Sequence, residues 1–250
     1  MALKLFEPND HSEKQVVILQ HFGLGDLFFI EPIYRHYDTL GYQVIAPVDD
    51  ESIWIKDYIP YVAFKRKSQF KYSYETVEQP NDGRLHVPLR FAHPLYRGYE
   101  LHYGDDKTNW MRDKYLFLGL DEELWRTMKL ERKDDKETEL FNQLGITGEY
   151  NFINEYFGGS FERVEIKPKN GLQNIYLKKV PGFTLLDWRK VIESAANIYT
   201  VETSILWVIE AMDTAAKELH LYPRMPFLPN VDYVKSYMRK NWIFHNESNM

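Results

Sequence analysis

Two glycines and an acid lie close together in residues 21–28, which read HFGLGDLF and follow a short apolar run. The run predicts a strand, and Gly23 and Gly25 let the backbone turn tightly and bring N–H groups close to a ligand. Open α/β sheets bind ligands at the carboxyl ends of their strands, so Asp26 is placed to act as a general base or to bind a substrate hydroxyl. His21 is a candidate partner for this acid. The structural alternative for Asp26 is an N-cap of the helix that follows.

Several kinds of site are disfavoured by what the sequence lacks. A dinucleotide-binding fingerprint needs a third glycine where the chain has Phe28, and Asp26 would repel a pyrophosphate. There is no P-loop, Asp-x-Asp, His-x-x-x-His or Gly-x-Ser-x-Gly pattern, which argues against metal-hydrolase and serine-hydrolase chemistry and predicts no metal site. Residues 49–51 are consecutive acids, but acids directly after a strand are typical of a turn and a helix start.

A second candidate site follows another short apolar run, at 198–201. Glu202, Thr203 and Ser204 come next, and a helical pattern begins there. The free N–H groups of a helix start, together with two hydroxyls, suit a diphosphate, while Glu202 suits a ribose or sugar hydroxyl. The structural alternative is an ordinary capped helix with Thr203 or Ser204 as the N-cap.

A third candidate is the segment 153–169, in which a strand leads into a Gly-Gly loop carrying Ser160, Arg163 and Lys167. Flexible glycines followed by cations describe a loop that closes over phosphate, and Arg163 would neutralise a leaving diphosphate. The alternative is a solvated surface loop.

The composition limits the partners of the chain. The 31 basic and 37 acidic residues leave a net charge of −6, which offers no bulk attraction to nucleic acid or to an anionic membrane. The absence of cysteine excludes disulfides, thiolate catalysis and iron–sulfur clusters. No apolar run approaches the roughly 20 residues of a transmembrane helix. The first residues are polar and acidic where a signal peptide needs an apolar core, so a cytoplasmic location is expected.

The hydrophobic pattern alternates strand with helix, which predicts an α/β fold with parallel sheets. Residues 16–47 form one predicted strand–helix–strand unit, with its helix at 26–40 closed by Gly41. Further strands are predicted at 62–65, 85–87, 150–154, 173–177, 198–201 and 219–222, and further helices at 106–118, 121–144, 184–196, 203–217 and 232–242. The predicted division is a lobe at 1–147, a second lobe at 148–228 and a C-terminal helix in 229–250 that packs back on the first lobe.

At this point two motifs fall into a known pattern. The stretch QHFGLGDLFFIEPIYRHYDTLGYQVIAPV resembles the N-terminal signature of the ADP-heptose:lipopolysaccharide heptosyltransferase-like glycosyltransferases, in which a strand leads to Gly-x-Gly-Asp and a helix with a proline. The stretch AANIYTVETSILWVIEAM resembles the C-terminal signature of the same family, in which a strand ends in an acid-Thr-Ser/Gly triplet that opens a helix. The two occur in the family's order.

The resemblance implies a GT-B fold, with two Rossmann-like lobes facing a cleft, and an inverting, metal-independent glycosyltransferase. It implies that Asp26 deprotonates the acceptor hydroxyl and that Thr203 and Ser204 bind the donor diphosphate. The first lobe would bind a glycan acceptor and the second a nucleotide-diphosphate sugar, with no cofactor beyond that donor.

The chain departs from the family pattern at two positions. Glu202 stands where Asp is usual, and Trp207 stands where the family commonly has His. Heptose is therefore not implied as the sugar. Two other functions stay open: a non-catalytic nucleotide-sugar or glycan-binding protein of the same fold, and, with less support, a Rossmann oxidoreductase.

Overall fold

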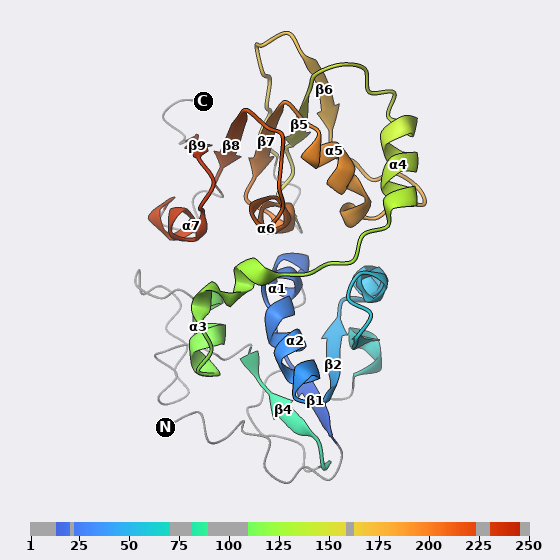
Figure 1. The fold of residues 1–250 in the computed structure, drawn as a ribbon, viewed down its shortest axis with the longest axis vertical. Helices are drawn as coiled ribbons and strands as arrows, with labels where there is room; N and C mark the ends of the chain where they lie inside the picture. Colours follow the sequence, from blue (N-terminus) through green and yellow to red (C-terminus); the bar gives the residue numbers. More distant parts are fainter. Residues whose placement is uncertain are drawn as a thin grey trace. The chain divides into compact units, whose positions relative to one another are not determined.

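The computed structural model describes residues 14–20, 23–70, 82–89, 110–158, 163–223 and 231–245. The predicted site residues His21 and Ser160 lie outside these ranges. The chain divides into two units, Met1–Glu131 and Arg132–Met250, each built on a sheet of its own (Figure 1). The division falls ahead of the predicted boundary at 147, and helix α4 (Asp134–Gln143) belongs to the second unit. The acceptor and donor roles of the lobes stay a prediction.

The sheet of the first unit has four parallel strands in the order β3-β2-β1-β4. These are β1 (Gln15–Ile18), β2 (Gln43–Val48), β3 (Val62–Arg66) and β4 (Leu85–Val87). Val16 is paired with Val44 on one side and with Leu85 on the other, which makes β1 a central strand. Its apolar residues are fully buried, as expected for a parallel sheet covered on both faces. Strands β3 and β4 confirm the two short strands predicted for this region.

The predicted helix 26–40 is two helices, α1 (Leu24–Phe29) and α2 (Glu31–Thr39). The break at Ile30 has a local cause: Pro32 has no N–H, and its ring clashes with the carbonyl of Phe28. The N-cap of α1 is Gly23, so the prediction that Asp26 caps the helix is wrong; it lies in the first turn. Gly41 has a positive φ of 83° and ends α2 as predicted.

Among the described residues of the first unit there are also three 3-10 segments and a further α-helix. The acidic residues 49–51 open η2 (Asp50–Asp57), and Asp50 accepts a hydrogen bond of 3.2 Å from the main-chain nitrogen of Ser68 in η3 (Lys67–Gln69). The cluster therefore serves a turn, as the sequence indicated. Helix α3 (Trp110–Phe117) and η5 (Glu122–Thr127) bring Tyr115 and Trp125 onto Phe29 of α1, with ring centroids 5.6 and 5.2 Å from its ring.

The sheet of the second unit has five parallel strands in the order β6-β5-β7-β8-β9. These are β5 (Tyr150–Asn154), β6 (Gln173–Tyr176), β7 (Asn197–Val201), β8 (Glu218–Tyr222) and β9 (Trp242–Phe244). The first four confirm predicted strands. Strand β7 is buried along its whole length between β5 and β8, so its carboxyl end delivers residues 202–204 to the middle of the sheet edge.

The helices of the second unit are shorter than predicted. The predicted helix 184–196 starts as a 3-10 turn, η6 (Leu185–Trp188), and continues as α5 (Arg189–Glu193). Thr184 and Asp187 form a capping box at its start. Helix α6 (Ser204–Ala211) ends well before the predicted residue 217. None of the helices in the described ranges has both the length and the apolar character needed to cross a bilayer.

The C-terminal segment is a helix followed by a strand rather than one helix. Helix α7 (Val231–Tyr237) ends five residues earlier than predicted, and β9 then pairs with β8. The buried carboxylate of Glu210 in α6 holds the connection between α7 and β9. It accepts hydrogen bonds from the main-chain nitrogens of Arg239 and Lys240, the latter at 3.1 Å, and from Trp242 Nε1 at 2.9 Å. These contacts tie the segment to the second unit.

Candidate functional site

Asp26 lies in the first turn of α1, eight residues after β1 ends at Ile18, and pairs with a distant lysine. Its Oδ1 accepts a hydrogen bond of 2.7 Å from Lys114 Nζ, across 88 residues of sequence. The side chain of Asp26 is 15% exposed and that of Lys114 only 1%. The pair therefore joins α1 to α3, with the lysine buried and the carboxylate partly exposed to solvent. Sequence reasoning missed Lys114, because nothing in its own segment marks it as functional.

The pKa of the buried Lys114 ammonium is lowered from its usual value, because burial outweighs the effect of Asp26. Burial lowers the pKa of the Lys114 ammonium, while the charge of Asp26 and the hydrogen bond to it raise that pKa. Nζ also lies 3.7 Å from the sulfur of Met111, which is a weak acceptor. Asp26 is thus a strong partner for a charge that would otherwise be expensive to bury.

The two carboxylate oxygens of Asp26 have different surroundings. A Cβ placed on Gly23 would come within 3.1 Å of Oδ2, so glycine at 23 leaves room beside this oxygen. In the part of the chain that the structure describes, Oδ2 has no hydrogen-bond partner. Gly23 is exposed and has φ −60°, so the glycine is needed here for space and not for a left-handed backbone. Gly25 lies within α1 itself.

Tyr34 of α2 is the second polar group near Asp26. Its side chain is fully buried, and within the described ranges its hydroxyl has no hydrogen-bond partner. Burial raises the pKa of Tyr34, and the charges of Asp26 and Glu31 raise it further. The phenol therefore stays neutral, and its ring packs edge to face on Phe64, with ring centroids 6.0 Å apart.

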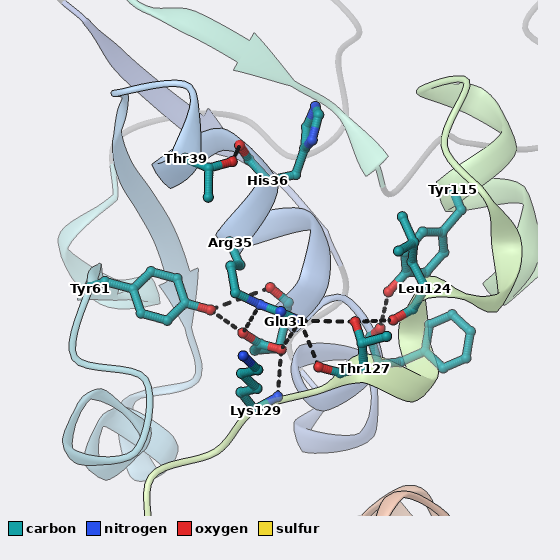
Figure 2. A network of polar contacts seen from close by, with 10 residues as sticks. Glu31, Arg35, His36, Thr39, Tyr61, Tyr115, Leu124, Thr127 and Lys129 are labelled. Atoms are coloured by element: carbon teal, nitrogen blue, oxygen red, sulfur yellow. Dashed lines mark hydrogen bonds and ion pairs between the residues drawn. The ribbon is translucent and has the colours of Figure 1, made fainter.

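Helix α2 is fixed by a network around Glu31, which Figure 2 shows. The carboxylate of Glu31 is fully buried and accepts hydrogen bonds from Tyr61 Oη, from Arg35 Nε at 3.2 Å and from the main-chain nitrogen of Lys129 at 2.7 Å. Arg35 Nη2 also donates to the carbonyl oxygen of Thr127 at 2.6 Å. The network joins α2 to the start of β3 and to the end of η5. The network fixes α2, which follows α1 directly in the chain, and no local sequence pattern predicted it.

In the second unit, Thr203 is the N-cap residue of α6, as one reading of the sequence predicted. Its side chain makes no capping hydrogen bond; its Oγ1 accepts from Asn154 Nδ2 at 3.2 Å. The same amide also donates to Thr200 Oγ1 at 3.0 Å. Thr203, Ser204 and Glu202 are half-buried, so the uncapped start of α6 lies at the surface of this unit. The N–H groups of such a helix start favour an anion.

The predicted phosphate-binding cations are engaged with carboxylates. Arg163 binds the buried Glu155, with Nε and Nη2 at 2.9 and 2.7 Å from Oε2, and Glu155 also accepts from the main-chain nitrogen of Ile166 at 2.8 Å. Lys167 pairs with Glu165 at 2.6 Å, and both of these side chains are exposed. The Arg163 pair closes the base of the Gly-Gly loop, whereas the Lys167 pair is a surface contact of small energy.

Comparisons with known proteins give little beyond this geometry. No protein-family model matches the chain, and no curated protein matches it significantly. Among solved structures, the chain is similar to the bacterial iron-containing dodecameric glycosyltransferase TibC from enterotoxigenic E. coli H10407, with 14% identity and a TM-score of 0.47. The match covers 84% of this chain and 58% of that one. A likeness of this size assigns neither an activity nor a substrate.

Proposed function

We propose that the chain is a metal-independent, inverting glycosyltransferase of the GT-B type, which moves a sugar from a nucleotide-diphosphate sugar to a hydroxyl of a glycan acceptor. The observation that carries the proposal is the state of Asp26. Its carboxylate lies past the carboxyl end of a central parallel strand, with one oxygen bound to Lys114 and the other beside the bare Cα of Gly23. Such a position favours a group that meets a ligand.

In the proposed reaction Asp26 is the general base. Oδ2 of Asp26 takes the proton of the acceptor hydroxyl while the acceptor oxygen forms a bond to the anomeric carbon of the donor sugar. The bond between the anomeric carbon and the diphosphate oxygen breaks on the opposite face, and its electron pair leaves with the nucleoside diphosphate. Configuration at the anomeric carbon is therefore inverted, and the proton ends on Asp26.

The start of α6 is the proposed site of the donor diphosphate. Because Thr203 Oγ1 already accepts from Asn154, the groups offered to phosphate are the first-turn N–H groups and the Ser204 hydroxyl. Glu202, anchored through its main-chain nitrogen to the carbonyl oxygen of Tyr222 at 3.1 Å, is assigned to a sugar or ribose hydroxyl. In this proposal Arg163 and Lys167 stabilise the leaving diphosphate after exchanging their present partners.

One observation favours the second candidate, a non-catalytic protein that binds nucleotide sugars or glycans. Arg163 is bound by a buried carboxylate that also holds a main-chain N–H group, which is the arrangement of a structural loop anchor. Without a cation for the leaving group, the fold would retain binding and lose turnover.

A thermal-shift panel of nucleoside mono- and diphosphates, nucleotide sugars and NAD(P), each with EDTA and with added Mn²⁺, tests the proposal. A ligand at 100 times its Kd adds about 2.7 kcal/mol of stability, a shift of several degrees. We expect one nucleoside diphosphate and its sugar to stabilise the protein equally well in EDTA, and that sugar to be transferred or hydrolysed. Binding without turnover favours the second candidate, and a response to NAD(P) alone contradicts both.

A further inference from the structure

We infer that Lys114 is a positioning residue, which orients the Asp26 carboxylate so that Oδ2 and not Oδ1 meets the acceptor hydroxyl. This inference rests on the proposed function, since it assigns the active oxygen of the proposed base. It begins from an asymmetry: Nζ lies 2.7 Å from Oδ1, whereas Oδ2 lies beside Gly23, where a Cβ would come within 3.1 Å of it.

The asymmetry matters because a carboxylate is free to rotate about its last side-chain bond. Without a fixed donor, an Asp in a first helical turn would exchange its two oxygens and sample several directions. Lys114 is fixed by its own burial, with 1% of its side chain exposed, so it offers a rigid donor to Oδ1 of Asp26. The other oxygen is then held toward the place where a substrate can approach.

The competing explanation is an ion pair that only ties α3 to α1. That tie already exists elsewhere. Tyr115 Oη donates a hydrogen bond of 2.5 Å to the carbonyl oxygen of Phe29, and the two rings pack edge to face. The neighbouring Lys114–Asp26 ion pair adds a desolvation cost, and the packing of α3 on α1 does not require it. Tyr115 therefore provides a matched comparison: it joins the same two helices without contacting Asp26.

Three variants of the full chain separate the two explanations. Lys114→Met keeps an unbranched stem of similar volume and removes the donor, and Lys114→Arg keeps a charged donor. Tyr115→Phe removes the other tie between α3 and α1. Crystal structures of the variants report the orientation of Asp26, and turnover of a panel of ADP-, GDP- and UDP-linked sugars is followed from pH 5 to pH 9.

We expect the Asp26 carboxylate to turn away from its present orientation in Lys114→Met and to keep it in Tyr115→Phe. Turnover should fall about 10- to 100-fold in Lys114→Met, with the acid limb of its pH profile moved to higher pH, and should recover in part in Lys114→Arg. An unmoved carboxylate in Lys114→Met overturns the inference, as do identical pH profiles in Lys114→Met and Tyr115→Phe. If the carboxylate turns but the wild-type chain turns over no donor, the positioning by Lys114 stands and the proposed function fails. If Lys114→Met does not fold, Lys114→Arg decides, because its guanidinium donates from a different position than Nζ: a carboxylate that turns with the new donor supports the inference, and a carboxylate that stays in place while the guanidinium moves away from Oδ1 contradicts it.

Discussion

Glu210 and Trp242 are joined inside the second unit by a hydrogen bond of 2.9 Å from the indole Nε1 to Oε2. The bond connects α6, which starts at the proposed diphosphate site, to β9 at the edge of the sheet. The position of α6 and the docking of the C-terminal strand therefore depend on the same buried carboxylate.

Glu210→Gln should destabilise the second unit by about 2 kcal/mol. The amide keeps the size of the side chain but turns one acceptor into a donor, which leaves N–H groups of Arg239 or Lys240 or the indole of Trp242 without an acceptor. Urea unfolding followed by tryptophan fluorescence measures the loss. Glu149→Gln is the control, because Glu149 forms an exposed pair with Lys217 and its loss should change the free energy of unfolding by less than about 1 kcal/mol. Equal losses in the two variants would contradict the role of Glu210.

Asp26→Asn should lower transfer by about 10²- to 10⁴-fold, the range usual for loss of a general base. Donor affinity measured by thermal shift should be unchanged, since the proposed donor residues lie in the other unit. The variant should also lose about 2 kcal/mol of stability, because a neutral amide is a weaker partner for the buried Lys114 ammonium than the carboxylate is. Near wild-type transfer with normal donor binding would remove Asp26 from the mechanism.

Gly23→Ala tests whether the acceptor approaches beside Gly23, because the substitution should hinder acceptor binding without lowering the stability of the protein. The backbone at Gly23 has φ −60° and ψ 139°, which alanine adopts without strain, so the free energy of unfolding should stay the same or rise by about 0.5 kcal/mol. The new Cβ, 3.1 Å from Asp26 Oδ2, crowds the oxygen assigned to the acceptor. Transfer should fall about tenfold through KM for the acceptor, and an unchanged acceptor KM would show that the substrate approaches from elsewhere.

Asp113 makes the stability of the first unit depend on pH. Burial, and after it the charge of Glu122, raises the pKa of Asp113 from 3.8 to about 7. Its Oδ2 is buried and has no hydrogen-bond partner within the described residues. Between these two pKa values the folded state binds more protons than the unfolded state, so the free energy of unfolding should fall as the pH rises from about 4 to about 7.

Asp113→Asn removes this titration and should flatten the dependence of unfolding free energy on pH in that interval. Urea unfolding at several pH values measures both slopes. Glu122→Gln, which removes only the smaller cause, should reduce the slope without abolishing it. A slope of the opposite sign in the wild-type chain would mean that Asp113 is ionised when folded.

The sequence predicted the strands well and the helices less well, for physical reasons. Short apolar runs such as residues 197–201 are strands because a parallel sheet buries both faces. A helix pattern, in contrast, did not reveal that Pro32 would divide residues 24–39, or that the pattern after residue 237 belongs to a strand. Strand β9 is held by Glu210, which lies 32 residues before Trp242, and no local pattern contains that contact.

In the candidate site, too, the sequence predicted the residues that a local pattern marks and missed those whose roles depend on distant partners. Asp26 and Thr203 stand next to glycines or strand ends that local sequence makes visible. Lys114 and Glu31 do not, because their roles depend on partners 88 and 98 residues away, Asp26 and Lys129. Arg163 was recognised as a cation, but its partner Glu155 was not, since an acid eight residues earlier in a loop has no periodic relation to it.

The chain passes from the first unit to the second between two neighbouring residues that are each anchored. The main-chain nitrogen of Glu131 donates to the carbonyl oxygen of Tyr58 at 2.8 Å, and Arg132 binds Glu193 through Nη1 at 2.5 Å and also pairs with Glu137. One peptide bond therefore separates two anchored networks, one in each unit. This bond is the natural place to split the protein into two fragments for reassembly, or to insert a flexible spacer that loosens the connection while both sheets keep their own contacts.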